Sequence, residues 1–525
     1  MLKLNFKILL LSVVLLLSAC AQLPIDFDAS PRYALQKTPK KELTNISNES
    51  KMILMSDGVD AFVARASLLY AAEKTIDIQY YIWHSDLAGK ILFNALIAAA
   101  DRGVKVRLLL DDMPVNKSTE SIFFAIDQHE NIEVRLFNPF ATRDFRYVTH
   151  LVSPKRINHR MNNKSFTVDT LHTIIGGRNI GDEYFSAHKN NNFKNIDVLA
   201  IGPIVKEISG QFNLYWNSEF VYSVTAFDHN KASGKSFQKV KKSLQQFVNL
   251  KENSKYHLNI KNSKIYQSIK QKRLPETPLY KIFRGEVHAV YDVPRKDLKK
   301  TEQKVTYLKF LIEPYVESIN KTFELISPYF VLGDEGVSYL TSMVNKGIKV
   351  RVLTNSLSST DGLMAQSGYS RIRYDLLAGG VELYELKKNS NTIERKSSTR
   401  GRKSKSTLHE KIYIFDREQV FIGSFDFDSR SPNINSKVGV VYDVAEMASL
   451  IATTVFDENI NNDAYKVMIA DKNMEKDDVE IDEGEIYWVE SINGKKHYYV
   501  AEPKTGFWRR FGQGILSIMP IESQL

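Results

Sequence analysis

Two short blocks of this 525-residue chain carry side chains that could act on a phosphate group. Both blocks have the same spacing: two candidate residues two positions apart, then an aspartate. The first block contains Asn162, Lys164 and Asp169, and the second contains His409, Lys411 and Asp416. Side chains alternate along a strand, so residues two apart share one face. An imidazole and an ammonium placed in this way can converge on one phosphate.

A repeat indicates which elements position these blocks. Residues 101–111 and 345–355 resemble each other and lie at nearly the same interval as the two blocks. Before them, residues 75–83 and 322–331 are rich in β-branched and aromatic residues, which is typical of strands. In each half a helical pattern ends at a glycine between the two strands. The sequence therefore predicts an α/β fold with two lobes, each with a central β-sheet flanked by helices.

The flanks of the two blocks resemble a known family. The matching motifs are residues 161–169 and 176–185 in the first half, and residues 408–416 and 423–428 in the second. In these motifs the chain resembles the phospholipase D superfamily. Residues 78–83, 326–330 and 508–522 look like the cardiolipin synthase-type branch, here in a bacterial lipoprotein. The resemblance implies a duplicated phospholipase D fold with two pseudo-twofold-related lobes.

The resemblance also implies a mechanism for phosphatidyl transfer or hydrolysis. One histidine attacks phosphorus to give a phosphohistidine, and the other protonates the leaving oxygen and later activates the incoming alcohol or water. Lysines stabilise charge on the phosphoryl oxygens, and neither a metal nor another cofactor is required. The residues that the resemblance assigns to catalysis are His409, Lys411, Asp416, Lys164 and Asp169.

The same resemblance assigns Asn179, Ser424 and Asn162 to binding of the substrate phosphate. A role in a local turn remains an alternative for Asn179 and Ser424. For Asp169 and Asp416 the alternative is support of the fold through local hydrogen bonds.

Several positions depart from the family pattern. Asn162 stands where the family has the histidine usually assigned as nucleophile, and an amide cannot form a phosphoramidate. Asp426 replaces an asparagine that normally faces the phosphate, and Lys437 replaces an acid expected to orient His409. Gln366 also occupies a position where the branch often has histidine. Asp197 is expected to keep the acidic position of the first half, and His159 is expected to point away from the site.

The beginning of the chain predicts export and lipidation. Lys3 and Lys7 precede an apolar run that ends at Leu-Ser-Ala-Cys20, which is typical of a lipoprotein signal with Cys20 as the lipidated residue. A signal peptide with Cys20 left as a stray thiol is the alternative. The chain is 43% hydrophobic and 25% charged, which excludes a fibrous or wholly disordered protein. Its net charge of +10 favours an anionic partner, and one cysteine excludes an internal disulfide.

Composition and motifs predict six segments. They are a lipoprotein signal peptide (1–19), a tether (20–50), the first phospholipase D-like lobe (51–225), a lysine-rich connector (226–285), the second lobe (286–470) and a C-terminal tail (471–525). Residues 387–405 form a basic loop within the second lobe. In the tail, Phe507, Phe511, Ile515 and Ile518 recur at helical spacing, which resembles an interfacial helix; a terminal helix packed on the lobes is the alternative.

Two functions of different classes follow. The first is a membrane-anchored phosphodiesterase or phosphatidyltransferase that acts on anionic phospholipids. The second is a catalytically degenerate protein that binds lipid headgroups or a partner, favoured by Asn162, Asp426 and Lys437. A nuclease is the least favoured interpretation, so nucleic acid is not the expected partner. The expected location is the bacterial cell envelope, on the periplasmic face of the outer membrane in a Gram-negative cell; the sequence leaves the oligomeric state open.

Overall fold

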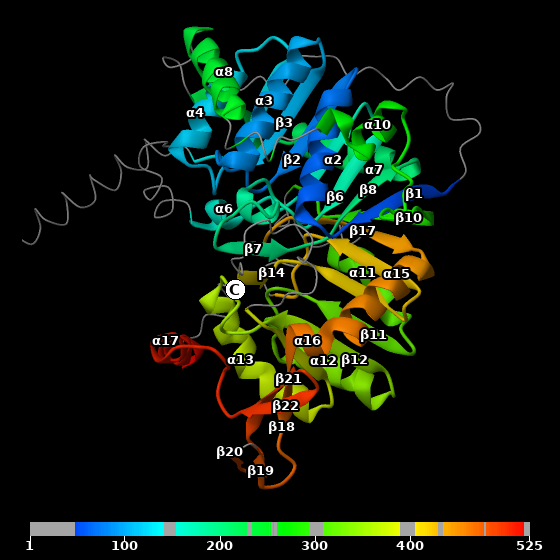
Figure 1. Ribbon diagram of the computed structural model, residues 1–525, viewed down its shortest axis with the longest axis vertical. Helices are drawn as coiled ribbons and strands as arrows, with labels where there is room; N and C mark the ends of the chain where they lie inside the picture. Colours follow the sequence, from blue (N-terminus) through cyan, green and yellow to red (C-terminus); the bar gives the residue numbers. More distant parts are fainter. Residues whose placement is uncertain are drawn as a thin grey trace, which may run out of the picture.

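The computed structural model describes residues 48–140, 154–227, 234–250, 253, 256, 260–294, 308–388, 405–428, 434–476 and 479–518. The expected lipidation site Cys20 and most of the basic loop, residues 389–404, lie outside these ranges. Two lobes are stacked along the long axis of the molecule (Figure 1). In the described residues no helix combines the length and the apolar character needed to cross a membrane.

The first lobe contains most of the blue to green part of Figure 1. Its elements are β1 (Ser50–Met55), α2 (Gly58–Ala71), β2 (Thr75–Tyr80), α3 (Leu87–Asp101), β3 (Lys105–Asp111), α4 (Lys117–Ile126), β4 (Ile132–Phe137), α6 (Pro154–Asn158), β5 (Ser165–Val168), β6 (His172–Gly176), β7 (Asn191–Lys194), β8 (Asp197–Ile201), α7 (Pro203–Trp216) and β9 (Val221–Ser223). Two further helices, α8 (Gly234–Asn249) and α10 (Lys264–Lys270), follow in the lysine-rich connector and pack on α3, α4 and α2.

The second lobe repeats this order. Its elements are β10 (Phe283–Tyr291), α11 (Leu308–Glu317), β11 (Thr322–Ile326), α12 (Asp334–Asn345), β12 (Lys349–Asn355), α13 (Leu363–Ala378), β13 (Glu382–Leu386), β14 (Lys405–Leu408), β15 (Ile412–Phe415), β16 (Gln419–Gly423), β17 (Val438–Asp443), α15 (Ala445–Ala452), α16 (Ile460–Asp463) and β18 (Ala464–Ile469). The tail adds β19 (Met474–Lys476), β20 (Val479–Ile481), β21 (Ile486–Ile492), β22 (Lys495–Tyr499) and α17 (Phe507–Ile518).

The strand pairing confirms the predicted duplicated α/β fold. In the first lobe β2, β3 and β4 are parallel, and β5 runs antiparallel to β2 before β6 and β8 extend the sheet. In the second lobe β11, β12 and β13 are parallel, and β15, β16 and β17 follow in the same way. Gly103 (φ 93°) and Gly347 (φ 87°) adopt the left-handed conformation after α3 and α12, as the sequence pattern predicts.

The two predicted strands that open each repeat are shorter than expected. β2 ends at Tyr80 and β11 ends at Ile326, although the apolar runs continue to Trp83 and Val331. In the second lobe Pro328 follows, and proline cannot donate a hydrogen bond to a neighbouring strand. Beyond these strand ends, Trp83 pairs with Ile180 and Phe330 pairs with Phe427 at isolated bridges outside the named strands.

The lobes are joined by strands and by a shared core. β1 pairs antiparallel with β10, and β7 of the first lobe pairs in parallel with β14 of the second. One apolar cluster contains Val198 and Ala200 of the first lobe together with Val438 and Val440 of the second. Because this cluster crosses the junction, the two lobes form one continuous body at the place where the two chemical blocks meet.

Asp169 and Asp416 hold equivalent positions at the far end of their strands. Asp169 accepts backbone hydrogen bonds from Glu73, Lys74 and Thr75 at 2.7–2.9 Å. Asp416 accepts those of Asn320, Lys321 and Thr322 at 2.8–2.9 Å. Each aspartate also begins a two-residue turn with positive φ at both positions, which is the geometry of a type I′ hairpin.

The block lysines and these aspartates therefore stand at opposite ends of short strands. A four-residue strand is about 13 Å long, so neither carboxylate lies beside the lysine of its own block. Each carboxylate instead fixes the start of β2 or β11 against the hairpin.

Asp416→Asn is expected to lower the free energy of unfolding by about 1–3 kcal/mol, because the amide nitrogen that replaces one carboxylate oxygen cannot accept a backbone hydrogen bond. Urea denaturation measures this change. Asp169→Asn should lower the free energy of unfolding by a similar amount. Asp471→Asn, at an exposed position, is the matched control. Equal stability of all three variants would contradict the structural role.

Candidate functional site

The two blocks meet at the junction of the lobes through exchanged backbone hydrogen bonds. The Asn162 N–H donates to the carbonyl of Ser436 (2.8 Å), and the His409 N–H donates to the carbonyl of Lys194 (3.0 Å). Each block is thus held by the segment that enters β17 or β8 of the other lobe. The site cannot form within one lobe, because each half is positioned by the opposite one.

The two block lysines repeat one geometry. Lys164 Nζ donates to the Asn162 carbonyl (2.9 Å), and Lys411 Nζ donates to the His409 carbonyl (3.2 Å). Lys164 also donates to the side-chain oxygen of Asn162. Both lysines are 2% exposed, whereas Asn162 and His409 are half-buried.

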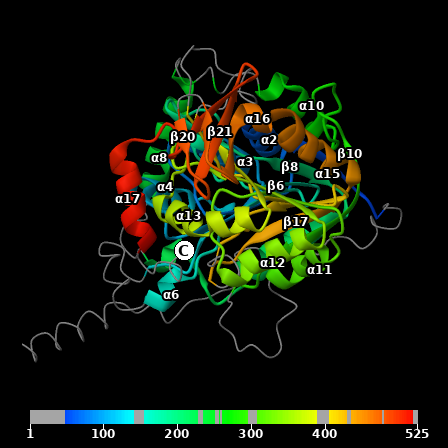
Figure 2. The same cartoon turned by 90° about the horizontal axis from the view of Figure 1, so that it is seen from below.

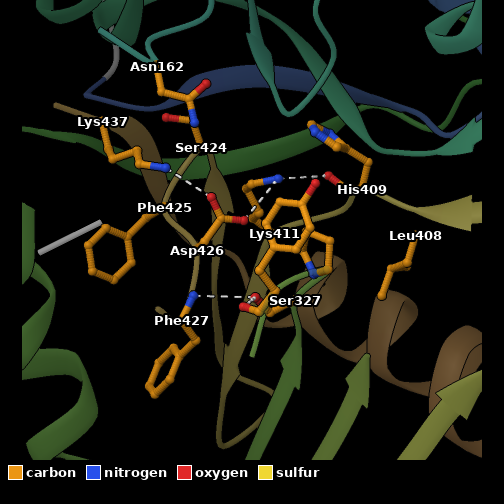
Figure 3. Close-up of polar contacts among 12 residues, drawn as sticks. Asn162, Ser327, Leu408, His409, Lys411, Ser424, Phe425, Asp426, Phe427 and Lys437 are labelled. Carbon is orange, nitrogen blue, oxygen red and sulfur yellow. Dashed lines mark hydrogen bonds and ion pairs between the residues drawn. The ribbon is translucent and has the colours of Figure 1, made fainter. Parts of the chain in front are cut away.

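Asp426 sits between two ammonium groups on the floor of the site (Figure 3). Its carboxylate lies 3.2 Å from Lys411 Nζ and 2.9 Å from Lys437 Nζ. Burial alone would raise the pKa of this carboxyl, but the two lysines hold it at about 2. Asp426 is therefore ionised, and its charge is neutralised by Lys437 before any ligand enters.

Lys437 and Asn195 are equivalent residues of the two lobes. Gly176 faces Asp197 in the first lobe, whereas Gly423 faces Gly439 in the second. Asn195 lies two residues before Asp197, and Lys437 lies two residues before Gly439. The expectation that Asp197 keeps the acidic position is therefore wrong, because the strand register puts Asn195 there.

Asp197 has a different role, since its carboxylate pairs with Arg65 (2.8 Å) and Arg178 (3.4 Å). The expectation that Lys437 replaces the residue orienting His409 is also wrong. Lys437 follows Ser436, whose carbonyl holds Asn162, so it belongs to the Asn162 side of the site. Asn195 takes the place beside His409, because orienting residues cross from one lobe to the other.

The His409 ring is fixed by three residues of the first lobe. Phe193 stacks on it with 5.3 Å between ring centroids, and Tyr184 meets it edge-on at 5.4 Å. Asn195 Nδ2 lies 3.1 Å from His409 Nδ1. The Asn195 Oδ1 accepts the Ile196 N–H (3.0 Å), which directs the amide nitrogen at the ring.

This arrangement determines the protonation of His409. Burial, followed by the charges of Lys411 and Lys164, lowers its pKa well below the usual value, so the ring is neutral. Because Nδ1 accepts from Asn195, the proton sits on Nε2. A ring in this state can donate a proton, but its Nε2 has no lone pair with which to attack phosphorus.

The ammonium groups make the site a receptor for an anion. Burial lowers the pKa of Lys164 well below its usual value, and Lys411 and Lys437 lower it further. An entering phosphate would relieve this repulsion and favour protonation of Lys164. In the described residues no group of three metal-ligating His, Cys, Asp or Glu side chains occurs.

Two of the predicted phosphate ligands have polar atoms engaged elsewhere. The Ser424 hydroxyl donates to the carbonyl of Val438 and accepts its N–H, both at 3.1 Å. The Asn179 amide accepts from Ile82 and donates to the Tyr184 hydroxyl. Both residues shape the walls of the site in this structure. The side-chain oxygen of Asn162 is also engaged, because it accepts from Lys164.

The remaining sequence candidates lie outside the cluster. His159 Nδ1 is 3.1 Å from the Ile434 carbonyl, which agrees with the expectation that it does not replace Asn162. Gln366 is buried on α13. Sequence reasoning missed Asn195, Phe193 and Tyr184, because their contacts with His409 depend on the pairing of β7 with β14.

Comparisons with known proteins agree with this geometry. A family model described as "Cardiolipin synthase, PLD-like domain" matches residues 66–216 and 315–458, which are the two lobes. This chain belongs to that cardiolipin synthase-like branch of the phospholipase D superfamily.

Individual relatives support the assignment. Cardiolipin synthase C of Escherichia coli is 36% identical over 473 residues, which cover 89% of this chain and 94% of the relative. An uncharacterized protein of Helicobacter pylori is 31% identical over 440 residues, covering 83% and 84%. The crystal structure of phosphatidylserine synthase from Haemophilus influenzae shares the fold, with a TM-score of 0.52, 13% identity and coverage of 79% and 87%.

Asp426→Asn and Lys437→Glu are each expected to lower the free energy of unfolding by about 3–5 kcal/mol, because each leaves buried charge unpaired. The double variant should lose less than the sum, since the carboxylate introduced at position 437 would again stand among the lysines. Urea denaturation of the four proteins measures the coupling. Additive losses would show that the two residues do not act as a pair.

The stability of the protein should depend on pH through His409. The ring stays neutral in the folded protein but takes up a proton in the unfolded chain below about pH 6.5, so the free energy of unfolding falls as pH falls through that value. His409→Gln should flatten this dependence in thermal unfolding, and the exposed His288→Gln should not. His172, whose pKa burial lowers to about 4, should keep part of the slope.

Proposed function

We propose that this protein acts on the phosphodiester of envelope phospholipids as a phosphatidyl-transferring or phosphatidyl-hydrolysing enzyme of the cardiolipin synthase type. The observation that carries the proposal is the convergence of Lys164, Lys411 and Lys437 with a neutral histidine at the lobe junction. Lys411 and Lys437 against one carboxylate already leave an excess of positive charge in a buried site, and an entering phosphate would favour protonation of Lys164, which suits the phosphate of a phospholipid.

The chemistry that remains for such an enzyme depends on His409 alone. To attack phosphorus, Nε2 must lose its proton and Nδ1 must carry it, which requires the Asn195 amide to turn its oxygen toward the ring. That rotation gives up the Ile196 hydrogen bond, at a cost of about 1 kcal/mol. Without a second acid or base at Asn162, turnover should be lower by roughly a hundred- to ten-thousand-fold than with two histidines.

A second candidate is binding of phospholipid headgroups without turnover. Asn162 and Asn195 favour it, because one removes a histidine and the other stabilises the tautomer of His409 that cannot attack. The cluster of Lys164, Lys411 and Lys437 would still bind a phosphate. In both candidates the anchor proposed at Cys20 keeps the protein on the bacterial envelope, on the periplasmic face of the outer membrane in a Gram-negative cell.

The test measures cardiolipin and phosphatidic acid formed by the full chain in vesicles of phosphatidylglycerol. Turnover should disappear in His409→Ala, remain in the exposed His288→Ala, and rise about tenfold or more in Asn162→His, which supplies a second acid and base. Asn195→Asp should also raise turnover, because a carboxylate accepts the Nδ1 proton and frees Nε2.

Two outcomes would overturn the enzymatic proposal. Turnover that persists in His409→Ala would show that His409 takes no part in the reaction. No product from any of these proteins, with phosphatidylglycerol still bound, would establish the second candidate in its place.

A further inference from the structure

The C-terminal helix α17 contacts the second lobe through polar groups. Arg509 Nη2 donates to the Thr360 carbonyl (2.6 Å), and Arg371 of α13 donates to the Ser517 carbonyl. Gln513, between them, is 6% exposed. These contacts hold α17 against α13 at the side of the second lobe (Figures 1 and 2).

The opposite side of α17 is apolar and faces solvent. Its exposed fractions are 65% for Phe507, 79% for Trp508, 52% for Phe511 and 49% for Ile515. The three rings contact one another, with centroids 5.4–6.2 Å apart. A helix at the surface of a globular protein normally buries its apolar stripe and exposes its polar face. The reverse orientation indicates that something apolar covers this stripe.

Positive charge surrounds the stripe. Arg509 and Arg510 lie on α17 itself. Lys388 lies near Lys405 and Arg509. Burial lowers the pKa of Lys388, and the charges of Lys405 and Arg509 lower it further. Aromatic side chains beside arginine and lysine match the boundary of a bilayer, where rings enter the acyl region and cations meet anionic headgroups.

We infer that α17 docks the second lobe on an anionic bilayer through Phe507, Trp508, Phe511 and Ile515. The inference rests on the proposed function, because a site that acts on phospholipid must lie beside a membrane. Hydrogen bonds connect the docking helix to the site. Thr360, held by Arg509, follows Ser359, whose carbonyl accepts from Thr407 (2.8 Å), two residues before His409.

The tryptophans of the chain make the inference measurable. The sequence has four, and Trp83, Trp216 and Trp488 are at most 4% exposed, whereas Trp508 is 79% exposed. The full chain is placed on vesicles of phosphatidylglycerol and phosphatidylcholine with brominated acyl chains, which quench tryptophan only at short range. We expect the emission of Trp508 to shift to the blue and to be quenched.

Variants separate docking from other causes. Trp508→Phe should remove most of the quenched emission, and Phe511→Ser with Ile515→Ser should reduce it by more than about half, because less apolar surface enters the bilayer. Leu279→Ser, at a leucine 77% exposed on a distant loop, is the matched control and should change nothing.

The test is independent of turnover, because His409→Ala should leave the quenching unchanged even if the proposed function fails. Vesicle-bound protein whose tryptophan emission is not quenched would overturn the inference. So would a dimer of the chain that forms without lipid and is broken by the same α17 substitutions, since a second copy would then cover the stripe.

Discussion

The site depends on the two ion pairs of Asp426. Lys164, Lys411 and Lys437 are buried together at the junction of the lobes, and like charges at such range repel strongly where water is excluded. The Asp426 carboxylate between two of the ammonium groups reduces this repulsion, and the cluster keeps a net positive charge. Burial, together with this excess of positive charge, keeps His409 neutral and lowers the pKa of Lys164. The same excess of positive charge lets the site hold an anion.

The departures from the family pattern have a physical explanation when neighbouring residues of the site are considered in pairs. An acid at position 426 would repel a phosphate if it stood alone, but Lys437 is there to neutralise it. Lys437 in turn faces Asn162, an amide that needs no orienting carboxylate. On the other side, Asn195 faces His409 and sets its tautomer. Each half of the site is therefore positioned by contacts that cross from one lobe to the other.

The position of α17 links this chemistry to the surface on which a phospholipid resides. Arg509 of α17 is attached to the loop between β12 and α13, which accepts a hydrogen bond from Thr407 of the strand before His409, and the aromatic side of α17 is turned outward. The family resemblance and the net positive charge both agree with a lipid partner. The packing of α17 on α13 confirms the alternative of a packed terminal helix. Docking of its apolar side on a bilayer stays a proposal.

The sequence by itself determined the duplicated α/β fold, the two blocks and the family, because strand periodicity, the glycines after the helices and the spacing of His409 and Lys411 are local properties. The replacement of the family's histidine by Asn162 was also visible in the sequence. Only the tertiary structure decided that Asn195 rather than Asp197 is the counterpart of Lys437, since strand register is set by pairing between distant segments. It also decided that Asp426 is ionised and that His409 carries its proton on Nε2, because proton affinities depend on burial and on charges brought together from both lobes.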